Sequence, residues 1–185
     1  MRIVGSKVAF KGFLTIHKLE VEGEDGARYS REIEDHGTAA AVLPYDPARR
    51  VALLVRQIRA PALWLGGPGD LAEAPAGMTD GEDPAATVHR EAMEEAGLRL
   101  GELEFVGAPF GMPGISTERI HLYLAAYGAA DRVGPGGGVA GENEHIAVEE
   151  IALAELWAQV EAGAVADLKT LALVQALKLR HPELF

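Results

Sequence analysis

Apolar and polar residues alternate through the first part of the chain. Between residues 6 and 34, Leu14 and Ile16, and later Tyr29 and Ile33, follow the two-residue period of β-strands around a turn signal at residues 24–26. The pattern predicts a small antiparallel sheet over residues 1–36. Because such an appendage often exposes an apolar face, we expect this segment to mediate a homodimer.

Longer apolar runs begin after residue 37 and alternate with helical patterns. Strands are predicted at residues 38–43, 51–58, 70–76, 103–106, 117–127 and 145–151, and helices at residues 84–96, 153–162 and 167–180. The stretch at residues 60–69 is rich in glycine and proline, so we expect an irregular loop there. This order predicts an α/β (α+β) domain over residues 37–185, a sandwich with a mixed sheet between helices.

The helix predicted at residues 84–96 has clear signals at both ends. Asp83 is a good N-cap residue, and Pro84 fits the first helical position, where no backbone donor is needed. Gly97 permits a left-handed end to the helix. Its apolar positions share one narrow face, which we expect to pack into a core.

Three carboxylates lie beside that apolar face. Glu91 and Glu95 are four residues apart and therefore lie one above the other, while Glu94 lies a step further round. Like charges at this spacing cost roughly 0.2–0.5 kcal/mol, and the last turn of a helix prefers cations. A divalent cation would offset the repulsion. The alternative is a solvated acidic face, which is common.

The composition narrows the range of partners. The chain has 185 residues and a net charge of −11, which argues against nucleic acid and acidic membrane surfaces as partners. It contains no cysteine, so thiol chemistry and disulfides are excluded. No apolar run approaches about 18 residues, and the N-terminus lacks the apolar core of a signal peptide, so we expect a cytoplasmic protein without a membrane span.

Residues 77–98 closely resemble the Nudix box, whose signature is a glycine, five residues, a glutamate, seven residues, then Arg-Glu-aliphatic-x-Glu-Glu-x-Gly-aliphatic. The positions that carry the resemblance are Gly77, Glu82, Arg90, Glu91, Glu94, Glu95, Gly97 and Leu98. The interval from Gly77 to Glu82 is one residue shorter than in the family. The loop before the helix is therefore trimmed, whereas the carboxylate spacing is kept.

Other segments look like the Nudix hydrolases that act on nucleoside diphosphate sugars. Pro113-Gly114, the run at residues 136–139 and the run at residues 163–170 are most similar to GDP-mannose hydrolases, with ADP-ribose pyrophosphatases the close alternative. The resemblance implies hydrolysis of the pyrophosphate bond of a nucleotide sugar to a nucleoside monophosphate and a sugar phosphate. Mg²⁺, for which Mn²⁺ could substitute, would neutralise the diphosphate and position a water molecule.

The resemblance also implies roles for single residues. We expect Arg90 to orient the glutamates and to pair with Glu82, and we expect a glutamate after the glycine-rich stretch at residues 132–143 to act as general base or metal ligand. That stretch is expected to be mobile, although a surface linker is an alternative. The expected metal ligands are the carbonyl of Ala76 and the carboxylates of Glu91, Glu94, Glu95 and Glu142, and the base is Glu142 or Glu144.

Candidate substrate contacts precede the box. Arg56 and Arg59 end the predicted strand at residues 51–58, and a guanidinium matches the geometry of a phosphate, although both arginines also suit a solvated strand edge. Glu73 lies in a stretch similar to the run before the box in nucleotide-sugar enzymes, and we expect it to contact substrate.

Two other functional classes are consistent with the sequence. One is a Nudix-fold module that binds a nucleotide without hydrolysing it, and the other is a purely structural acidic domain. The presence of Glu91, Glu94 and Glu95 favours the enzyme, because a binding module can lose its metal ligands freely, and a structural domain would leave the whole box unexplained.

Overall fold

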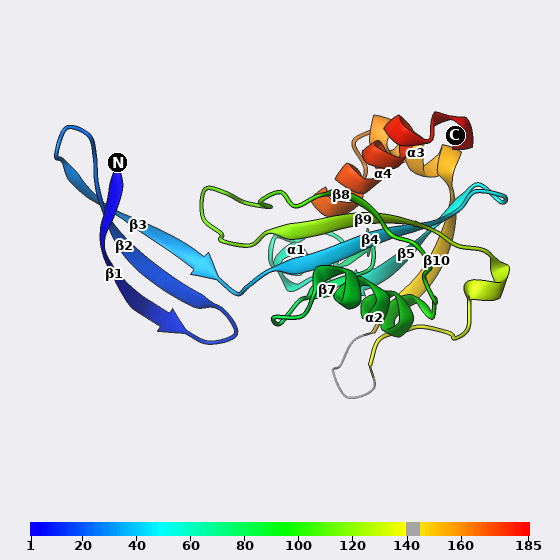
Figure 1. Cartoon of the computed structure of the whole chain (residues 1–185), viewed down its shortest axis with the longest axis horizontal. Coiled ribbons are helices and arrows are strands. Elements are labelled where there is room, and N and C mark those ends of the chain that lie inside the picture. Colours follow the sequence, from blue (N-terminus) through cyan, green and yellow to red (C-terminus); the bar gives the residue numbers. More distant parts are fainter. Residues whose placement is uncertain (140–144) are drawn as a thin grey trace.

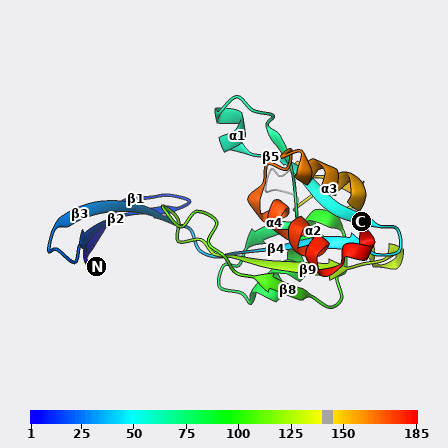
Figure 2. The same cartoon turned by 90° about the horizontal axis from the view of Figure 1, so that it is seen from above.

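The protein contains two β-sheets, which lie toward opposite ends of an elongated molecule (Figure 1; Figure 2). The computed structural model describes residues 1–139 and 145–185. In the first of these ranges, β1 (Arg2–Lys11), β2 (Thr15–Glu22) and β3 (Arg28–Asp35) form a three-stranded antiparallel sheet in that order. The small N-terminal sheet predicted from the alternating pattern is confirmed.

The second sheet is mixed. Within the described residues its strands are β4 (Ala39–Asp46), β5 (Val51–Ile58), β6 (Asp70–Glu73), β7 (Ala76–Met78), β8 (Glu104–Gly107), β9 (Ile120–Ala126) and β10 (Ala147–Ala152). The order is β10-β5-β4-β9-β8, with β6 paired to β5 and β7 paired to β4. β4 and β9 are parallel, and the other pairs are antiparallel.

Helices cover both faces of this sheet. Their bounds are α1 (Ala60–Trp64), α2 (Pro84–Ala96), α3 (Leu153–Glu161) and α4 (Leu168–Arg180), with short 3₁₀ turns at Ala129–Asp131 and Pro182–Leu184. Among the described residues, none of the helices has the length and apolar character needed to cross a bilayer. The predicted sandwich, with a mixed sheet between helices, is confirmed.

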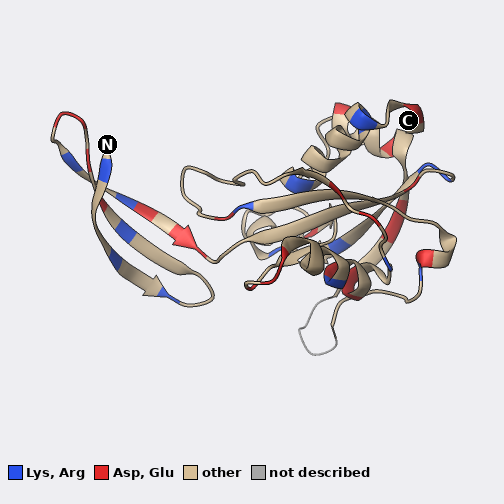
Figure 3. Ribbon diagram, in the orientation of Figure 1, with Lys and Arg blue, Asp and Glu red and all other residues tan. Residues whose placement is uncertain are grey.

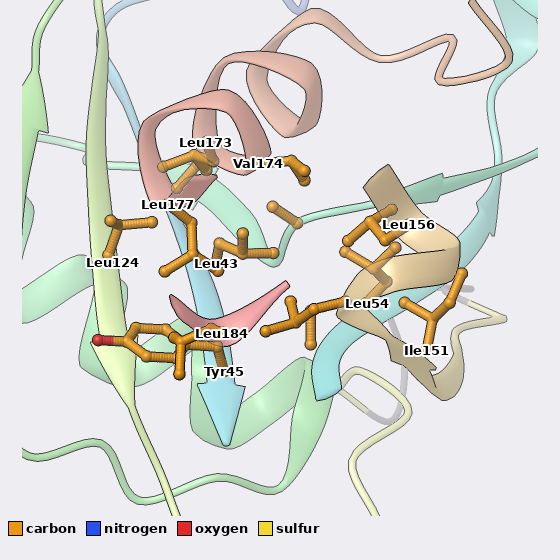
Figure 4. Close-up of a cluster of buried hydrophobic side chains, with 14 of the residues drawn as sticks. Leu43, Tyr45, Leu54, Leu124, Ile151, Leu156, Leu173, Val174, Leu177 and Leu184 are labelled. Atoms are coloured by element: carbon orange, nitrogen blue, oxygen red, sulfur yellow. The ribbon is translucent and has the colours of Figure 1, made fainter. Parts of the chain in front are cut away.

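The central strand β4 is buried along its whole length, so its side chains supply both cores. Val42 points to the cluster under α2, and the next residue, Leu43, points to the cluster under α3 and α4. Figure 4 shows Leu43 among leucines of α4, with Leu54 of β5 closer to α3. Two apolar layers therefore hold α2 and the α3–α4 pair on opposite faces.

Two segments near the box differ from the expectation. Within residues 60–69, expected to be irregular, Ala60–Trp64 forms a short helix, and Pro61 lies in its first turn, where proline is tolerated. The strand expected at residues 70–76 is divided, because Pro75 cannot donate to a ladder. β6 therefore pairs with β5, and after Pro75 the chain moves across to pair with β4 as β7.

The two sheets are joined through the loop that precedes β9. The backbone N–H of Glu34 donates to the carbonyl of Ile115 at 2.8 Å, and the N–H of Thr117 donates to the carbonyl of Glu34 at 3.1 Å. The hydroxyl of Thr117 also donates to Asp35 at 2.7 Å. The end of β3 is therefore attached to the main domain.

Candidate active site

The helix α2 begins and ends where the sequence predicts. The carboxylate of Asp83 accepts hydrogen bonds from the backbone N–H groups of Ala85 and Ala86 at 3.0 and 3.2 Å, and Gly97 ends the helix with φ 65°. Val88 is fully buried with the apolar residues of β4 and β5. This burial sets the rotation of the helix and hence the direction of its carboxylates.

Two of those carboxylates lie against the strand that precedes the helix. Glu95 is only 3% exposed, and its carboxylate accepts hydrogen bonds from the backbone N–H of Ala76 at 3.0 Å and from the side chain of Gln57 at 3.4 Å. The carboxylate of Glu91 lies so close to Gly77 that a Cβ there would be 1.8 Å from Oε1. The absence of a side chain at Gly77 thus makes room for Glu91.

Arg90 holds the acidic face together, as expected. Its Nη1 lies 2.8 Å from Glu91 and 2.9 Å from Glu94, and its Nε lies 3.4 Å from Glu82. Burial would lower the pKa of Arg90, but the neighbouring carboxylates outweigh burial and raise it. Figure 3 shows basic and acidic positions side by side on this helix. The guanidinium therefore offsets the repulsion between the carboxylates and orients two of them.

The glycine-rich stretch packs onto the C-terminal end of α2. The backbone N–H of Gly137 donates to the carbonyl of Glu95 at 2.8 Å. Gly136 has φ 69°, and a Cβ there would lie 2.3 Å from the same carbonyl oxygen. Glycine in this stretch therefore permits a close approach to the helix, and the expected mobility stays a prediction.

The residues of this face fit a divalent cation. In the described ranges, no group of three acidic or histidine side chains is arranged to hold an ion by itself. Mg²⁺, however, usually takes only one or two carboxylates and completes its shell with water and substrate phosphates. Glu91 and Glu95 supply hard oxygen donors that lie against the Ala76–Gly77 backbone. This donor set suits Mg²⁺ better than softer metals.

A cavity of about 520 Å³ opens beside this backbone. Ala76 and Gly77 line it, together with Arg59, Glu73 and Lys169. Burial would raise the pKa of Glu73, but hydrogen bonds from Arg59 and the charge of Lys169 hold that pKa below its usual value. Two cations therefore line the cavity, and so do Ala76 and Gly77, the two residues that the carboxylates of Glu95 and Glu91 contact.

The structure separates the two arginines that the sequence groups together. Arg59 lines this cavity and binds Glu73 through two hydrogen bonds of 2.7 and 2.9 Å. Arg56 lies in a different cavity of about 230 Å³, where it pairs with Glu149 at 3.1 Å and with Asp70 at 3.5 Å. Glu142 and Glu144, the expected base or ligand, lie outside the described residues.

Two site residues escaped the sequence analysis. Gln57 follows Leu53 and Val55 on the face of β5 that meets α2, so the two-residue period of that strand could have found it. Lys169 lies in the run at residues 163–170, and the local sequence carries no signal that brings it to Glu73.

Known proteins resemble this chain over nearly its whole length. Residues 35–174 match the family model described as NUDIX domain. The chain is 36% identical over 186 residues to the GDP-mannose pyrophosphatase of Cronobacter sakazakii (strain ATCC BAA-894), with 97% of this chain and 96% of that protein covered. It is 32% identical over 185 residues to the GDP-mannose pyrophosphatase of Escherichia coli O1:K1 / APEC, with 97% and 95% covered.

A solved structure has the same fold. The crystal structure of an ADP compounds hydrolase superposes with a TM-score of 0.76 at 17% identity, with 97% of this chain and 95% of that chain covered. At this identity the likeness shows the fold alone. With the family and full-length sequence matches, the expected enzyme class, a hydrolase acting on phosphoric anhydrides, is confirmed, and the chain belongs to the Nudix family.

Proposed function

We propose that this protein hydrolyses the pyrophosphate bond of a nucleoside diphosphate sugar in a Mg²⁺-dependent reaction, with GDP-mannose the favoured substrate. One observation carries the proposal. Glu91 and Glu95 are held against the Ala76–Gly77 backbone, and that backbone lines a cavity that also contains Arg59 and Lys169. The backbone that contacts the acidic ligands thus lines the same space of about 520 Å³ as the basic groups for phosphate.

The residues divide into three roles in this proposal. Glu91, Glu94, Glu95 and the carbonyl of Ala76 would hold the metal, which when bound supplies charge neutralisation and activates water. Arg90 keeps the carboxylates oriented, and Arg59 binds phosphate. Glu142 or Glu144 would accept the proton of the attacking water, a contribution of roughly 10²–10⁴-fold for a general base.

The substrate preference rests on the relatives. The two similar proteins named above are both GDP-mannose pyrophosphatases, and each matches nearly the whole chain. The alternative substrate is ADP-ribose, which the named fold neighbour, an ADP compounds hydrolase, brings into consideration. A nucleotide-binding module without hydrolysis is the remaining alternative.

The N-terminal sheet supports a homodimer in this proposal. Within β1–β3, only Val21 is buried, so the described part of this sheet has almost no core of its own. Ile3, Val8 and Phe10 are exposed. Because a sheet without a core is marginal in water, a second copy that covers these side chains would stabilise it.

A substrate panel tests the activity. GDP-mannose, ADP-ribose, ADP-glucose and UDP-glucose are incubated with the protein, with Mg²⁺, with Mn²⁺ and with EDTA, and nucleoside monophosphate release is measured. We expect cleavage of GDP-mannose with Mg²⁺ and its loss in EDTA. A folded protein that binds Mg²⁺ but cleaves none of the four would favour the binding module.

The metal assignment has its own test. Glu95→Gln is expected to lower kcat by more than about 100-fold. Mutating a residue that only supports a metal ligand already lowers metal affinity or activity by roughly 10–100-fold, and a ligand itself should matter more. Its thermal melting should stay close to that of the wild type, and its Mg²⁺ affinity should fall. Glu82→Gln is the matched control, since this exposed box glutamate contacts Arg90 only at 3.4 Å. Undiminished turnover by Glu95→Gln would refute the assignment.

A further inference from the structure

Residues 131–138, called here the docked segment, run alongside the C-terminal end of α2 and the residues that follow it. Leu98, just after the helix, forms an isolated antiparallel bridge with Arg132. The backbone N–H of Gly134 donates to the carbonyl of Gly97, the residue that ends the helix, at 3.1 Å. The docked segment is therefore attached to the main chain at the end of the box helix.

The docked segment also supplies hydrogen bonds that α2 cannot make for itself, because the last carbonyls of a helix have no partner within it. The carbonyl of Glu95 accepts from the backbone N–H of Gly137 at 2.8 Å. The carbonyl of Glu94 accepts from the backbone N–H of Gly138 at 3.1 Å. The last turn of α2 has no basic residue, although this end of a helix favours positive charge. The two N–H groups therefore place the positive ends of peptide dipoles where the helix carries two acids.

This close approach requires that residue 136 has no side chain. Gly136 has φ 69°, and a Cβ there would lie 2.3 Å from the carbonyl oxygen of Glu95 and 2.8 Å from backbone atoms of Ala96. Both neighbours are helix backbone, so neither can move aside without a shift of α2. A larger residue at position 136 would therefore push the docked segment away from the helix or displace the last turn.

The residues whose carbonyls are bound here are two of those whose side chains are proposed as metal ligands. The carboxylate of Glu95 accepts from the backbone N–H of Ala76 at 3.0 Å, while its carbonyl accepts from the docked segment. The carboxylate of Glu94 accepts from Arg90 at 2.9 Å. A shift of the last turn would therefore move both carboxylates relative to Glu91, which lies one turn earlier.

We propose, building on the metal assignment in the function given above, that Gly136 is a positioning residue for metal binding. It allows the docked segment to bind the carbonyls of Glu94 and Glu95, and these bonds hold the last turn of α2 where its carboxylates meet the cation. The effect is reciprocal. If docking of the segment favours metal binding, a bound metal stabilises the docked segment by the same free energy.

The test is the Mn²⁺ affinity of Gly136→Ala, measured without substrate from the electron paramagnetic resonance signal of the free ion. We expect the Kd to rise roughly 10- to 100-fold, the range for loss of a residue that supports a metal ligand. In turnover of GDP-mannose, the Mg²⁺ concentration that gives half the maximal rate should rise similarly, and kcat should approach the wild-type value at saturating Mg²⁺. Unchanged Mn²⁺ affinity with a kcat that stays low at saturating Mg²⁺ would overturn the inference.

Gly163→Ala is the matched control. Gly163 has φ 67°, close to that of Gly136, so alanine meets the same backbone strain there. Among the described residues, however, no other part of the chain lies within 4 Å of a Cβ at this position. We expect the Mn²⁺ affinity of this variant to equal that of the wild type. An equal loss in both variants would attribute the effect to backbone strain and would overturn the inference.

Hydrogen exchange tests the reciprocal effect in the wild type, so it does not depend on a variant that folds. We expect Mg²⁺ to slow the exchange of the backbone N–H groups of Gly137 and Gly138, measured by NMR, because the docked segment should open less often. The N–H of Gly26, which donates to Gly23 in the N-terminal sheet, is the internal reference. Exchange rates at Gly137 and Gly138 that do not change at saturating Mg²⁺ would contradict the coupling.

The metal-binding measurement separates this inference from the proposed activity. If the wild type binds Mn²⁺ but cleaves no nucleotide sugar, the proposed activity fails, and weaker Mn²⁺ binding by Gly136→Ala still supports the positioning role. If the wild type cleaves GDP-mannose and Gly136→Ala binds Mn²⁺ equally well, the positioning role fails and the activity stands. Thermal melting of each variant separates a loss of metal affinity from a loss of fold.

Discussion

At the scale of single residues, the site depends on small and buried groups as much as on its acids. The carboxylate of Glu91 takes the space that a side chain at Gly77 would occupy. Glu95 is buried and bound to the backbone of Ala76, so its orientation is set before any ligand arrives. The sequence predicted both glutamates, but it could not predict these contacts, which depend on how α2 lies against β7.

Gly77→Ala tests the contact with Glu91. The new Cβ would lie 1.8 Å from Oε1 of Glu91, so that carboxylate must move. We expect metal affinity and turnover to fall by roughly 10–100-fold, as for loss of a residue that supports a metal ligand. Gly101→Ala is the control, because nothing lies within 4 Å of a Cβ there. Full activity in Gly77→Ala would show that Glu91 need not hold this position.

At the scale of elements, local signals predicted some boundaries well and others poorly. Asp83 and Gly97 bound α2 as expected, because capping depends on residues within a few positions. The division of one predicted strand into β6 and β7 depends on which neighbour each half meets, and that choice is tertiary. The packing of the glycines at residues 136–137 against the end of α2 is likewise a tertiary contact that the local sequence does not reveal.

Glu150 of β10 is a titratable carboxylate that links this strand to neighbouring parts of the main domain. Glu150 accepts hydrogen bonds from Arg49 at 2.7 and 2.9 Å and from the hydroxyl of Tyr127 at 2.8 Å. The hydrogen bonds from Arg49 have the largest effect on the pKa of Glu150 and lower it. Burial opposes them, but the hydrogen bond from Tyr127 adds to them, and the pKa lies below its ordinary value of 4.5. The ionised form of this carboxylate therefore stabilises the folded state more than the protonated form does.

Glu150→Gln should change the acid stability accordingly. A group with a depressed pKa stabilises the fold above its unfolded pKa and loses that contribution as the pH falls through its folded pKa. We expect the variant to have a lower Tm than the wild type at pH 7, and the difference to shrink as the pH falls below 4.5. Melting curves between about pH 3 and 7 measure it. A difference that is constant over this range would contradict the prediction.

At the scale of the whole molecule, the N-terminal sheet stands out because it leaves apolar side chains exposed and has almost no buried core. It projects from the main domain (Figure 2) and is joined to it through the loop before β9. The exposed apolar residues on β1 belong to neither core cluster of the mixed sheet. Alternation in the sequence predicted the sheet, and the homodimer that would cover it stays a prediction.

The double substitution Val8→Glu with Phe10→Glu tests the homodimer. If a second copy covers these side chains, two buried charges should dissociate it, because an unpaired charge is costly in an apolar interface. We expect the wild type to have twice the mass of the 19.6 kDa chain by light scattering, and the variant to have the monomer mass. Leu179→Glu, at an apolar site on α4 that is even more exposed, serves as the control. A monomeric wild type would refute the dimer.

The sequence by itself determined the elements that depend on neighbouring residues. The box helix with its caps, the buried strands and the three carboxylates on one helix face all follow from periodicity and capping, which act over a few positions. Only the tertiary structure decided that Arg59 lines the cavity while Arg56 lies elsewhere, that Gly77 makes room for Glu91, and that Lys169 reaches Glu73. These contacts join distant segments through strand pairing and helix packing, and no local pattern encodes which side chains then meet.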